Sequence, residues 1–245
     1  MSSGRLRAFV RLLTVQGAWN YERMTGVGLG HAAEPLLEDL KSADPARHAE
    51  AAVRSAEYFN SHPYLAGLAL GALVRAEYDF VPGPQIARLR AALCSPLGAL
   101  GDQLYWIGLV PALMAAGIVA VVAGLGLWSL AAILVTYNFV RLWTGAWALN
   151  AGLKAGARVG TAIGNSWLPG AASRAGRAAG LLVGLALPLA ADWLLDGESS
   201  RNVVLAVVTM LAGLGLAWQL GPRITAVRFG LLAIGIAATL AWRIG

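Results

Sequence analysis

The uncharged run QLYWIGLVPALMAAGIVAVVAGLGLWSLAAILVTYNFV extends from Gln103 to Val140, and Asp102 and Arg141 stand at its two ends. A single helix of this length, at about 1.5 Å per residue, would be nearly twice the ~30 Å thickness of the hydrocarbon core of a bilayer. The segment Val122 to Trp128 contains two glycines, which allow the backbone to reverse direction. The run therefore predicts a re-entrant or hairpin pair of short apolar arms. A turn-like segment, Cys94 to Asp102, is expected to precede it.

The two charges that end this run should lie on the same face of the membrane. They have opposite sign, and a charge held at low dielectric needs a counter-charge or several hydrogen bonds. We therefore expect Asp102 and Arg141 to meet or to share polar partners.

The composition places the whole chain in the membrane class. Charged residues make up 13% of it and hydrophobic residues 58%, whereas soluble domains are roughly a quarter charged. The expected fold is an all-α polytopic membrane protein with amphipathic N-terminal helices, re-entrant or hairpin helices, and C-terminal transmembrane helices. The basic residues behind the net charge of +6 are scattered singly between apolar runs, so they indicate loops that set membrane orientation and not a nucleic-acid surface. The single cysteine, Cys94, excludes an internal disulfide, and no metal or cofactor is expected.

The N-terminus reads as an amphipathic helix. Leu6, Phe9, Val10 and Leu13 fall at helical spacing with arginines between them. The arginines also interrupt any apolar core of a secretory signal. Two interpretations remain open: a helix on the cytoplasmic membrane surface, or an ordinary helix packed on the protein.

Two polar stretches follow. Gln16 to Met24 mixes aromatic, amide and ion-pairing side chains and predicts packed polar structure. Glu34 to Glu57 holds many of the acidic residues and predicts a solvated segment of two short helices, beginning at Glu34-Pro35 and Asp44-Pro45.

The next apolar stretch, Leu65 to Val74, is too short to cross a membrane and predicts a buried or re-entrant helix. Asn60 and His62 precede it, either as pocket ligands or as hydrogen-bonded turn residues. After it, Arg75, Glu77 and Asp79 are expected to return the chain to water.

The C-terminal part is rich in glycine and apolar residues. Glycines recur at spacings of four, which lets helices approach closely within a membrane: Gly156, Gly160, Gly164, then Gly176, Gly180 and Gly184. Three stretches can cross: Ala178 to Leu195, Val203 to Leu220, and Val227 to Trp242. The positive-inside tendency puts the N-terminus and Arg223 in the cytoplasm, and Glu198 and Gly245 outside.

The predicted organisation therefore has two parts. Residues 1 to 156 hold the polar helices and the central hairpin, and residues 157 to 245 hold the glycine-rich connection and three transmembrane helices.

Four segments together resemble the IID component of the mannose, fructose and sorbose family of the bacterial phosphoenolpyruvate-dependent sugar phosphotransferase system. In family order they are Gln16 to Met24, Glu57 to Tyr64, Ser95 to Trp106, and Asn138 to Gly156. Family members often carry a substantial external insertion where this chain has only Asp196 to Asn202.

The resemblance implies a multi-pass subunit of the bacterial cytoplasmic (inner) membrane. It would pair with a IIC subunit to move a hexose-type sugar, while separate IIA and IIB proteins carry the phosphate. The IIC and IID subunits are expected to form a trimer of heterodimers. IID members are not known for a phosphorylated residue, so Cys94, His31, His48 and His62 are not expected to be phosphocarriers, and the chain is not expected to be an enzyme itself.

Polar groups at membrane depth are costly unless partnered, so they are candidates for the sugar pathway or the partner interface. The candidates are Asn20, Glu22, Arg23, Asn60, His62, Asp102, Asn138 and Arg141. The same groups could instead hold broken helix ends together. A second class of function also stays open, a non-transporting membrane scaffold or regulatory protein derived from the family. An intramembrane enzyme finds little support, because no nucleophile, base and orienting group recur at recognisable spacing.

Overall fold

The computed structural model describes residues 4 to 195 of the chain. The chain divides into the units Met1–Ala190 and Ala191–Gly245. Two of the predicted spans, Val203 to Leu220 and Val227 to Trp242, lie outside the described residues, as do Glu198, Arg223 and Gly245.

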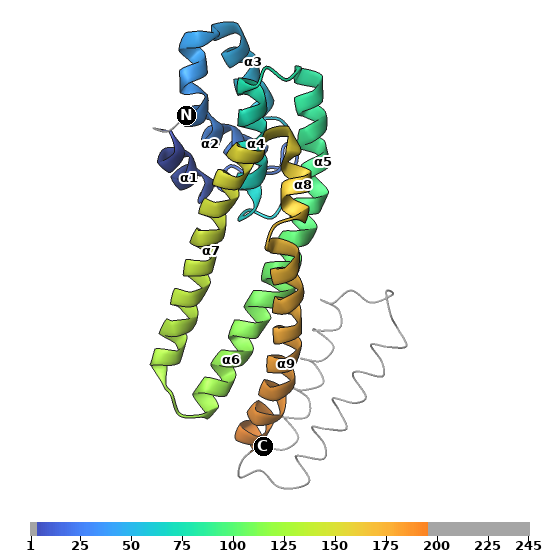
Figure 1. Ribbon diagram of the computed structural model, residues 1–245. Helices are drawn as coiled ribbons and strands as arrows, with labels where there is room; N and C mark the ends of the chain where they lie inside the picture. Colours follow the sequence, from blue (N-terminus) through green and yellow to red (C-terminus); the bar gives the residue numbers. More distant parts are fainter. Residues whose placement is uncertain (1–3, 196–245) are drawn as a thin grey trace. The chain divides into compact units, whose positions relative to one another are not determined.

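The described residues form helices joined by short loops (Figure 1), which confirms the all-α prediction. Their order is α1 Arg5–Leu12, α2 Gly26–Ala43, α3 Pro45–Ser55, α4 Ala66–Tyr78, α5 Gly83–Asp102, the π-helical η1 Gln103–Leu109, α6 Val110–Val122, α7 Leu127–Ala155, the short η2 Gly156–Arg158, α8 Val159–Gly164 and α9 Leu168–Leu195. The first predicted C-terminal span lies in α9.

The predicted hairpin is confirmed. Helices α6 and α7 lie side by side and are joined by a tight turn (Figure 1). Gly124 and Gly126 have φ of 79° and 60°, a region that costs glycine little and other residues more. The helices approach closely at Gly117, where an added Cβ would lie 2.5 Å from Cδ1 of Ile133.

The turn predicted for Cys94 to Asp102 is wrong. Helices α5, η1 and α6 follow one another without a break over Gly83–Val122, and Pro96 lies inside α5. Leu93 and Leu97 are buried on either side of that proline, so tertiary packing overrides the local turn chemistry. Within residues 4 to 195, Gly83–Val122 is the one helical stretch whose length and apolar composition would let it cross a bilayer.

Helix α4 is the buried centre, as its apolar sequence predicts. It lies against α7 so closely that an added Cβ on Gly67 would stand 2.9 Å from the backbone nitrogen of Leu149. Gly71 and Gly152 are equally tight against the facing backbone. The sequence pattern pointed to other glycines: Gly160, Gly164, Gly176, Gly180 and Gly184 have no described atom within 4 Å of an added Cβ. Their predicted close packing has no partner in the described part of the chain.

Of the two predicted short helices, only the second begins as expected. The Asp44 side chain accepts a hydrogen bond from the backbone N–H of Arg47 at 3.0 Å, and Pro45 opens α3. The start predicted at Glu34-Pro35 is wrong, because Pro35 lies inside α2. The buried face of α2 continues past it through Leu36 and Leu40, and that packing keeps the helix intact.

Candidate functional site

A polar cleft of about 660 Å³ opens beside the end of the hairpin where η1 begins. Four regions line it: the segment after α1, the segment before α4, the second half of α5, and the first half of η1. The structure brings three predicted site residues together there, Asn60, His62 and Asp102. Gln16, Tyr58, Ser61, Ser95 and Trp106 also line it and were not singled out from the sequence.

His62 is the most enclosed of these side chains, at 3% exposed. Its ring stacks on Tyr105 with 4.9 Å between centroids. Helix α5 passes so close that an added Cβ on Gly101 would collide with the imidazole. Glycine at this position is therefore what lets the ring sit in the cleft wall.

The electrostatics keep the His62 ring neutral. Burial lowers the pKa of His62 to about 4, although the nearby Asp102 carboxylate acts in the opposite direction. Nδ1 accepts the backbone N–H of Tyr64 at 3.4 Å, which assigns the ring proton to Nε2. Nε2 has no hydrogen-bond partner among the described residues. Nε2 is itself enclosed, so His62 contributes a buried, unpaired N–H in the cleft wall, near the exposed carboxylate of Asp102.

A tyrosine cluster holds this segment on the hairpin. The hydroxyls of Tyr64 and Tyr137 are 2.9 Å apart, which ties the start of α4 to α7. The Tyr64 and Tyr105 rings meet edge to face at 4.8 Å. Trp106 follows on the same helical segment and is 52% exposed at the cleft. An aromatic face beside amides, a carboxylate and a neutral imidazole suits an uncharged ligand rich in hydroxyl groups.

The other N-terminal candidates lie outside the cleft lining. The Asn20 side chain accepts the backbone N–H groups of Glu22 at 3.1 Å and Arg23 at 2.8 Å, so it closes a turn. Glu22 and Arg23 form a pair 3.9 Å apart with side chains 84% and 48% exposed. The packed polar structure predicted for this stretch is wrong, because most of it lies at the surface: Tyr21 is 86% exposed.

The two candidates on the hairpin, Asn138 and Arg141, also lie outside the cleft lining. Asn138 donates from Nδ2 to the carbonyl of Leu134 at 2.9 Å and is exposed on α7. Arg141 lines a different, smaller cavity. None of the ion pairs in the described part joins it to Asp102, so the prediction that the two charges meet or share polar partners is wrong in its first form. Their neighbours differ: Asp102 acts on His62, and Arg141 covers the ring of Tyr64.

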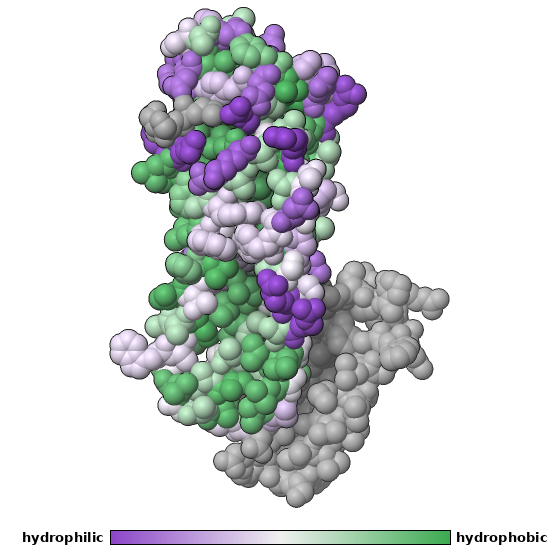
Figure 2. Space-filling view, viewed as in Figure 1, coloured by the Kyte–Doolittle hydropathy of each residue, from purple (hydrophilic) through white to green (hydrophobic). Residues whose placement is uncertain are grey.

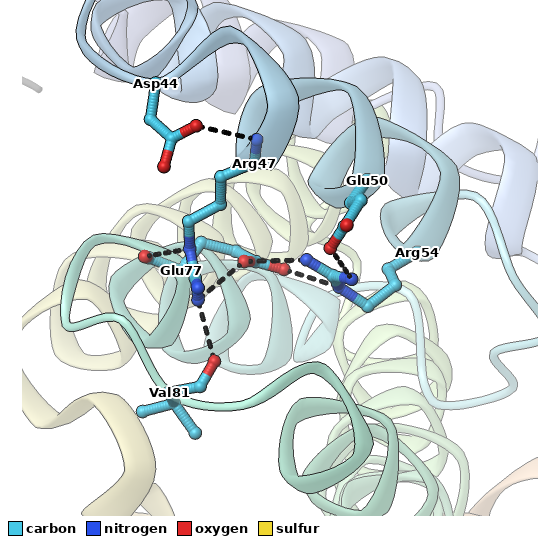
Figure 3. Close-up of polar contacts among 6 residues, drawn as sticks. All are labelled: Asp44, Arg47, Glu50, Arg54, Glu77 and Val81. Carbon is cyan, nitrogen blue, oxygen red and sulfur yellow. Dashed lines mark hydrogen bonds and ion pairs between the residues drawn. The ribbon is translucent and has the colours of Figure 1, made fainter.

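A buried ionic cluster at Glu77 was missed. The sequence indicated that Glu77 returns to water, but it is 4% exposed (Figure 3). Arg54 donates to its two carboxylate oxygens at 2.9 and 3.1 Å, and Arg47 lies 3.0 Å from one of them. Arg47 also donates to the backbone carbonyls of Glu77 and Val81. The hydrogen bond to Glu77 raises the pKa of Arg54. The cluster fastens α3 to α4, and the arginine spacing of seven along α3 is the signal that could have indicated it.

The side chains divide the visible surface into two zones. Figure 2 shows hydrophilic residues gathered at the end that holds the N-terminal helices, and hydrophobic residues over the hairpin. Fold and cleft together define a class, a helical membrane protein with a polar cleft at one end of an apolar hairpin.

The family follows from sequence comparison. Residues 2–188 match the model of the PTS system mannose/fructose/sorbose family IID component. The chain belongs to this family, as its motifs indicated.

Individual relatives agree with this placement. The mannose-specific EIID component of Escherichia coli K12 is 29% identical over 141 residues, covering 56% of this chain and 50% of that protein. The fructose permease IID component of Bacillus subtilis 168 is 28% identical over 114 residues, covering 44% of this chain and 41% of that protein. The chain thus aligns with about half the length of these relatives or less.

Two solved structures share the fold. One, described as a membrane protein, has a TM-score of 0.72 at 21% identity, with 98% of this chain and 97% of that chain covered. The other is the mannose transporter ManYZ in complex with microcin E492, with a TM-score of 0.58 at 20% identity and the same coverage.

Proposed function

We propose that this chain is the IID subunit of a mannose-family sugar transporter of a bacterial inner membrane. In this proposal it is multi-pass and acts with a IIC subunit, in a trimer of heterodimers, to move a hexose-type sugar that a separate IIB protein, charged by IIA, phosphorylates. The family match supports this proposal. The names of two relatives, a mannose-specific EIID component and a fructose permease IID component, support it as well. The observation that carries it at the residue level is the polar cleft, where Asn60 and Asp102 lie beside the exposed indole of Trp106.

Within the cleft, the roles follow from the donor and acceptor inventory. Asp102 accepts hydrogen bonds from hydroxyl groups, and Asn60 can both donate and accept. His62, whose Nε2 is enclosed, shapes the wall between them. Trp106 offers an apolar face to a sugar ring. Asn20, Glu22, Arg23 and Asn138 lie on exposed or turn positions and are proposed to contact the partner subunit.

The chain is proposed to carry no phosphoryl group itself. His62 is enclosed and stacked, which suits a side chain that shapes the cleft wall better than one that exchanges a group between proteins. Phosphoryl transfer is assigned to the separate IIA and IIB proteins.

The experiment is co-expression with the neighbouring IIC gene, co-purification, and phosphoenolpyruvate-dependent uptake of a panel of labelled sugars. Asp102→Asn should lower uptake of the preferred sugar about tenfold or more, since one charged hydrogen bond is worth ~1.5 to 3 kcal/mol. Arg88→Gln, an exposed change on α5 outside the cleft lining, is the control. Normal uptake by Asp102→Asn, with co-purification intact, would contradict the cleft assignment.

The alternative is a scaffold or regulatory protein of the same family that no longer transports. The short connection Asp196 to Asn202 motivates it. It predicts co-purification with IIC but no uptake of any sugar in the panel, so the same experiment separates the two.

A further inference from the structure

A second cavity lies between α1 and α7 and borders the polar cleft, since Gln16 and Pro63 line both. Its volume is about 90 Å³, and its lining includes Leu12 at the end of α1, Tyr64 before α4, and Arg141 on α7. One water needs ~15 Å³ on this measure, so the cavity has room for several heavy atoms. The five atoms of a phosphate group are of this size.

The cavity contains a cation without a counter-charge. The Arg141 guanidinium lies 5.5 Å from the centroid of the Tyr64 ring. Its Nε is buried and has no hydrogen-bond partner, and no ion pair among residues 4 to 195 includes it. Two arginines of α3, Arg47 and Arg54, by contrast, both reach Glu77. Arg141 is half-buried with an enclosed, unpaired Nε, and an anion accepting hydrogen bonds from its guanidinium would stabilise it.

Arg141 also lies at the end of the apolar hairpin, toward the boundary between hydrocarbon and water. It is the first charged residue after the uncharged run of the hairpin. Indole rings gather just beyond it: Trp167 lies 4.9 Å from Trp143 and 5.1 Å from Trp147. Aromatic belts of this kind mark the boundary between hydrocarbon and water.

The cavity continues into an exposed apolar stripe. Helix α1 buries Ala8 and Leu12 on the protein but leaves a second stripe outward, with Leu6 73%, Val10 54% and Leu13 45% exposed. Leu13 belongs to both the stripe and the cavity lining. Arg5 and Arg7 are exposed beside the stripe. The helix thus packs on the protein, as one of the two interpretations from the sequence predicted. Its outward apolar stripe between cations is typical of interfacial helices, and its place on the membrane surface stays a prediction.

We propose that this cavity binds the phosphate of an anionic phospholipid. Arg141 takes the phosphate oxygens, and an acyl chain runs along Leu13 and Val10. The apolar mouth favours a lipid over a soluble phosphate, and the exposed arginines of α1 favour an anionic headgroup. The proposal does not depend on the sugar cleft.

The test uses the full chain together with any subunit that co-purifies with it. Native mass spectrometry in a neutral detergent measures the affinity for phosphatidylglycerol and for phosphatidylcholine with the same acyl chains. The wild type should bind phosphatidylglycerol at least tenfold more tightly. Arg141→Gln should lose most of that preference, and Arg88→Gln, which removes an exposed charge from α5, should retain it. Equal binding of the two lipids, or an unchanged preference in Arg141→Gln, would overturn the proposal.

Further variants and competition measurements identify the source of the anion. Leu13→Asp adds a negative charge at an exposed position, so it should fold and still weaken phosphatidylglycerol binding several-fold. Val53→Asp, at an exposed position on α3 outside the cavity lining, is its control. Displacement of the lipid by millimolar glycerol 3-phosphate would assign the site to a soluble phosphate. Binding that disappears when a partner subunit is present would assign it to an anion of that partner, and either outcome rejects the lipid.

Discussion

At the scale of single residues, the Glu77 cluster gives a stability prediction. Glu77→Gln removes the carboxylate that both Arg47 and Arg54 contact and leaves two partly buried cations without it. Breaking a buried ion pair by removing one partner costs ~3 to 5 kcal/mol. We expect a clearly lower unfolding midpoint in detergent, measured by thermal denaturation.

The matched control for that change is Glu50→Gln. Glu50 also pairs with Arg54, at 3.0 Å, but its side chain is 69% exposed. An exposed pair contributes ~0 to 1 kcal/mol, so the midpoint should barely move. Equal effects of the two substitutions would mean that burial does not govern this cluster.

His62 gives a prediction for pH dependence. Its pKa is about 4 in the folded chain, against ~6.5 in an unfolded one. Between these values the unfolded chain binds the extra proton, so the free energy of unfolding falls as pH drops from 6.5 to 4. His62→Asn should flatten this fall by up to ~1.4 kcal/mol per pH unit, measured by denaturant titration in detergent. Parallel pH profiles for variant and wild type would contradict the neutral, buried assignment.

At the scale of elements, the sequence predicted the hairpin well because the reasons are local. The uncharged run is too long for one span, and the glycines that reverse it lie within it. The buried state of α4 was equally visible in its composition. The continuation of α5 through Pro96 could not be predicted from the sequence, because contacts from other elements bury Leu93 and Leu97.

The cleft, too, could be predicted only where its causes are local. Asn60 and His62 are neighbours in sequence, but Asp102 joins them only because α5 passes close to His62 at Gly101. The spacing of Arg47 and Arg54 puts both on one face of α3, but it does not identify Glu77 as their partner, since Arg54 reaches it across 23 residues and Arg47 across 30. Such pairings depend on tertiary geometry, which residue spacing alone does not contain.

The contact between α4 and α7 gives an element-level prediction. An added Cβ on Gly71 would lie 2.6 Å from the carbonyl oxygen of Leu149, and backbone cannot yield as a side chain can. Gly71→Ala should therefore destabilise the fold by ~1 to 3 kcal/mol, as overpacking does. Gly160→Ala on α8 meets no described atom within 4 Å and should leave the thermal midpoint unchanged or raise it. Similar midpoints for the two variants would show that the close approach is not needed.

At the scale of the whole molecule, the length of the hairpin decides whether it crosses the bilayer or only enters it. The arm before the turn has 7 residues in η1 and 13 in α6, 20 in all. At about 1.5 Å per residue this is ~30 Å, the thickness of the hydrocarbon core. We therefore expect the turn at Gly124 to Gly126 to reach the face opposite the cleft. The positive-inside tendency places the cleft and the arginines of α1 on the cytoplasmic side.

Single-cysteine labelling tests this arrangement once Cys94 is replaced by serine. Leu125→Cys, at a turn position 62% exposed, should react with an impermeant maleimide added to intact cells. Ala99→Cys, which lines the cleft, should react only after the membrane is opened. A cysteine at 125 that never reacts would mean that the turn ends within the hydrocarbon and the hairpin is re-entrant. A cysteine at 99 that reacts in intact cells while 125 does not would reverse the orientation and move the Arg141 cavity to the outer leaflet.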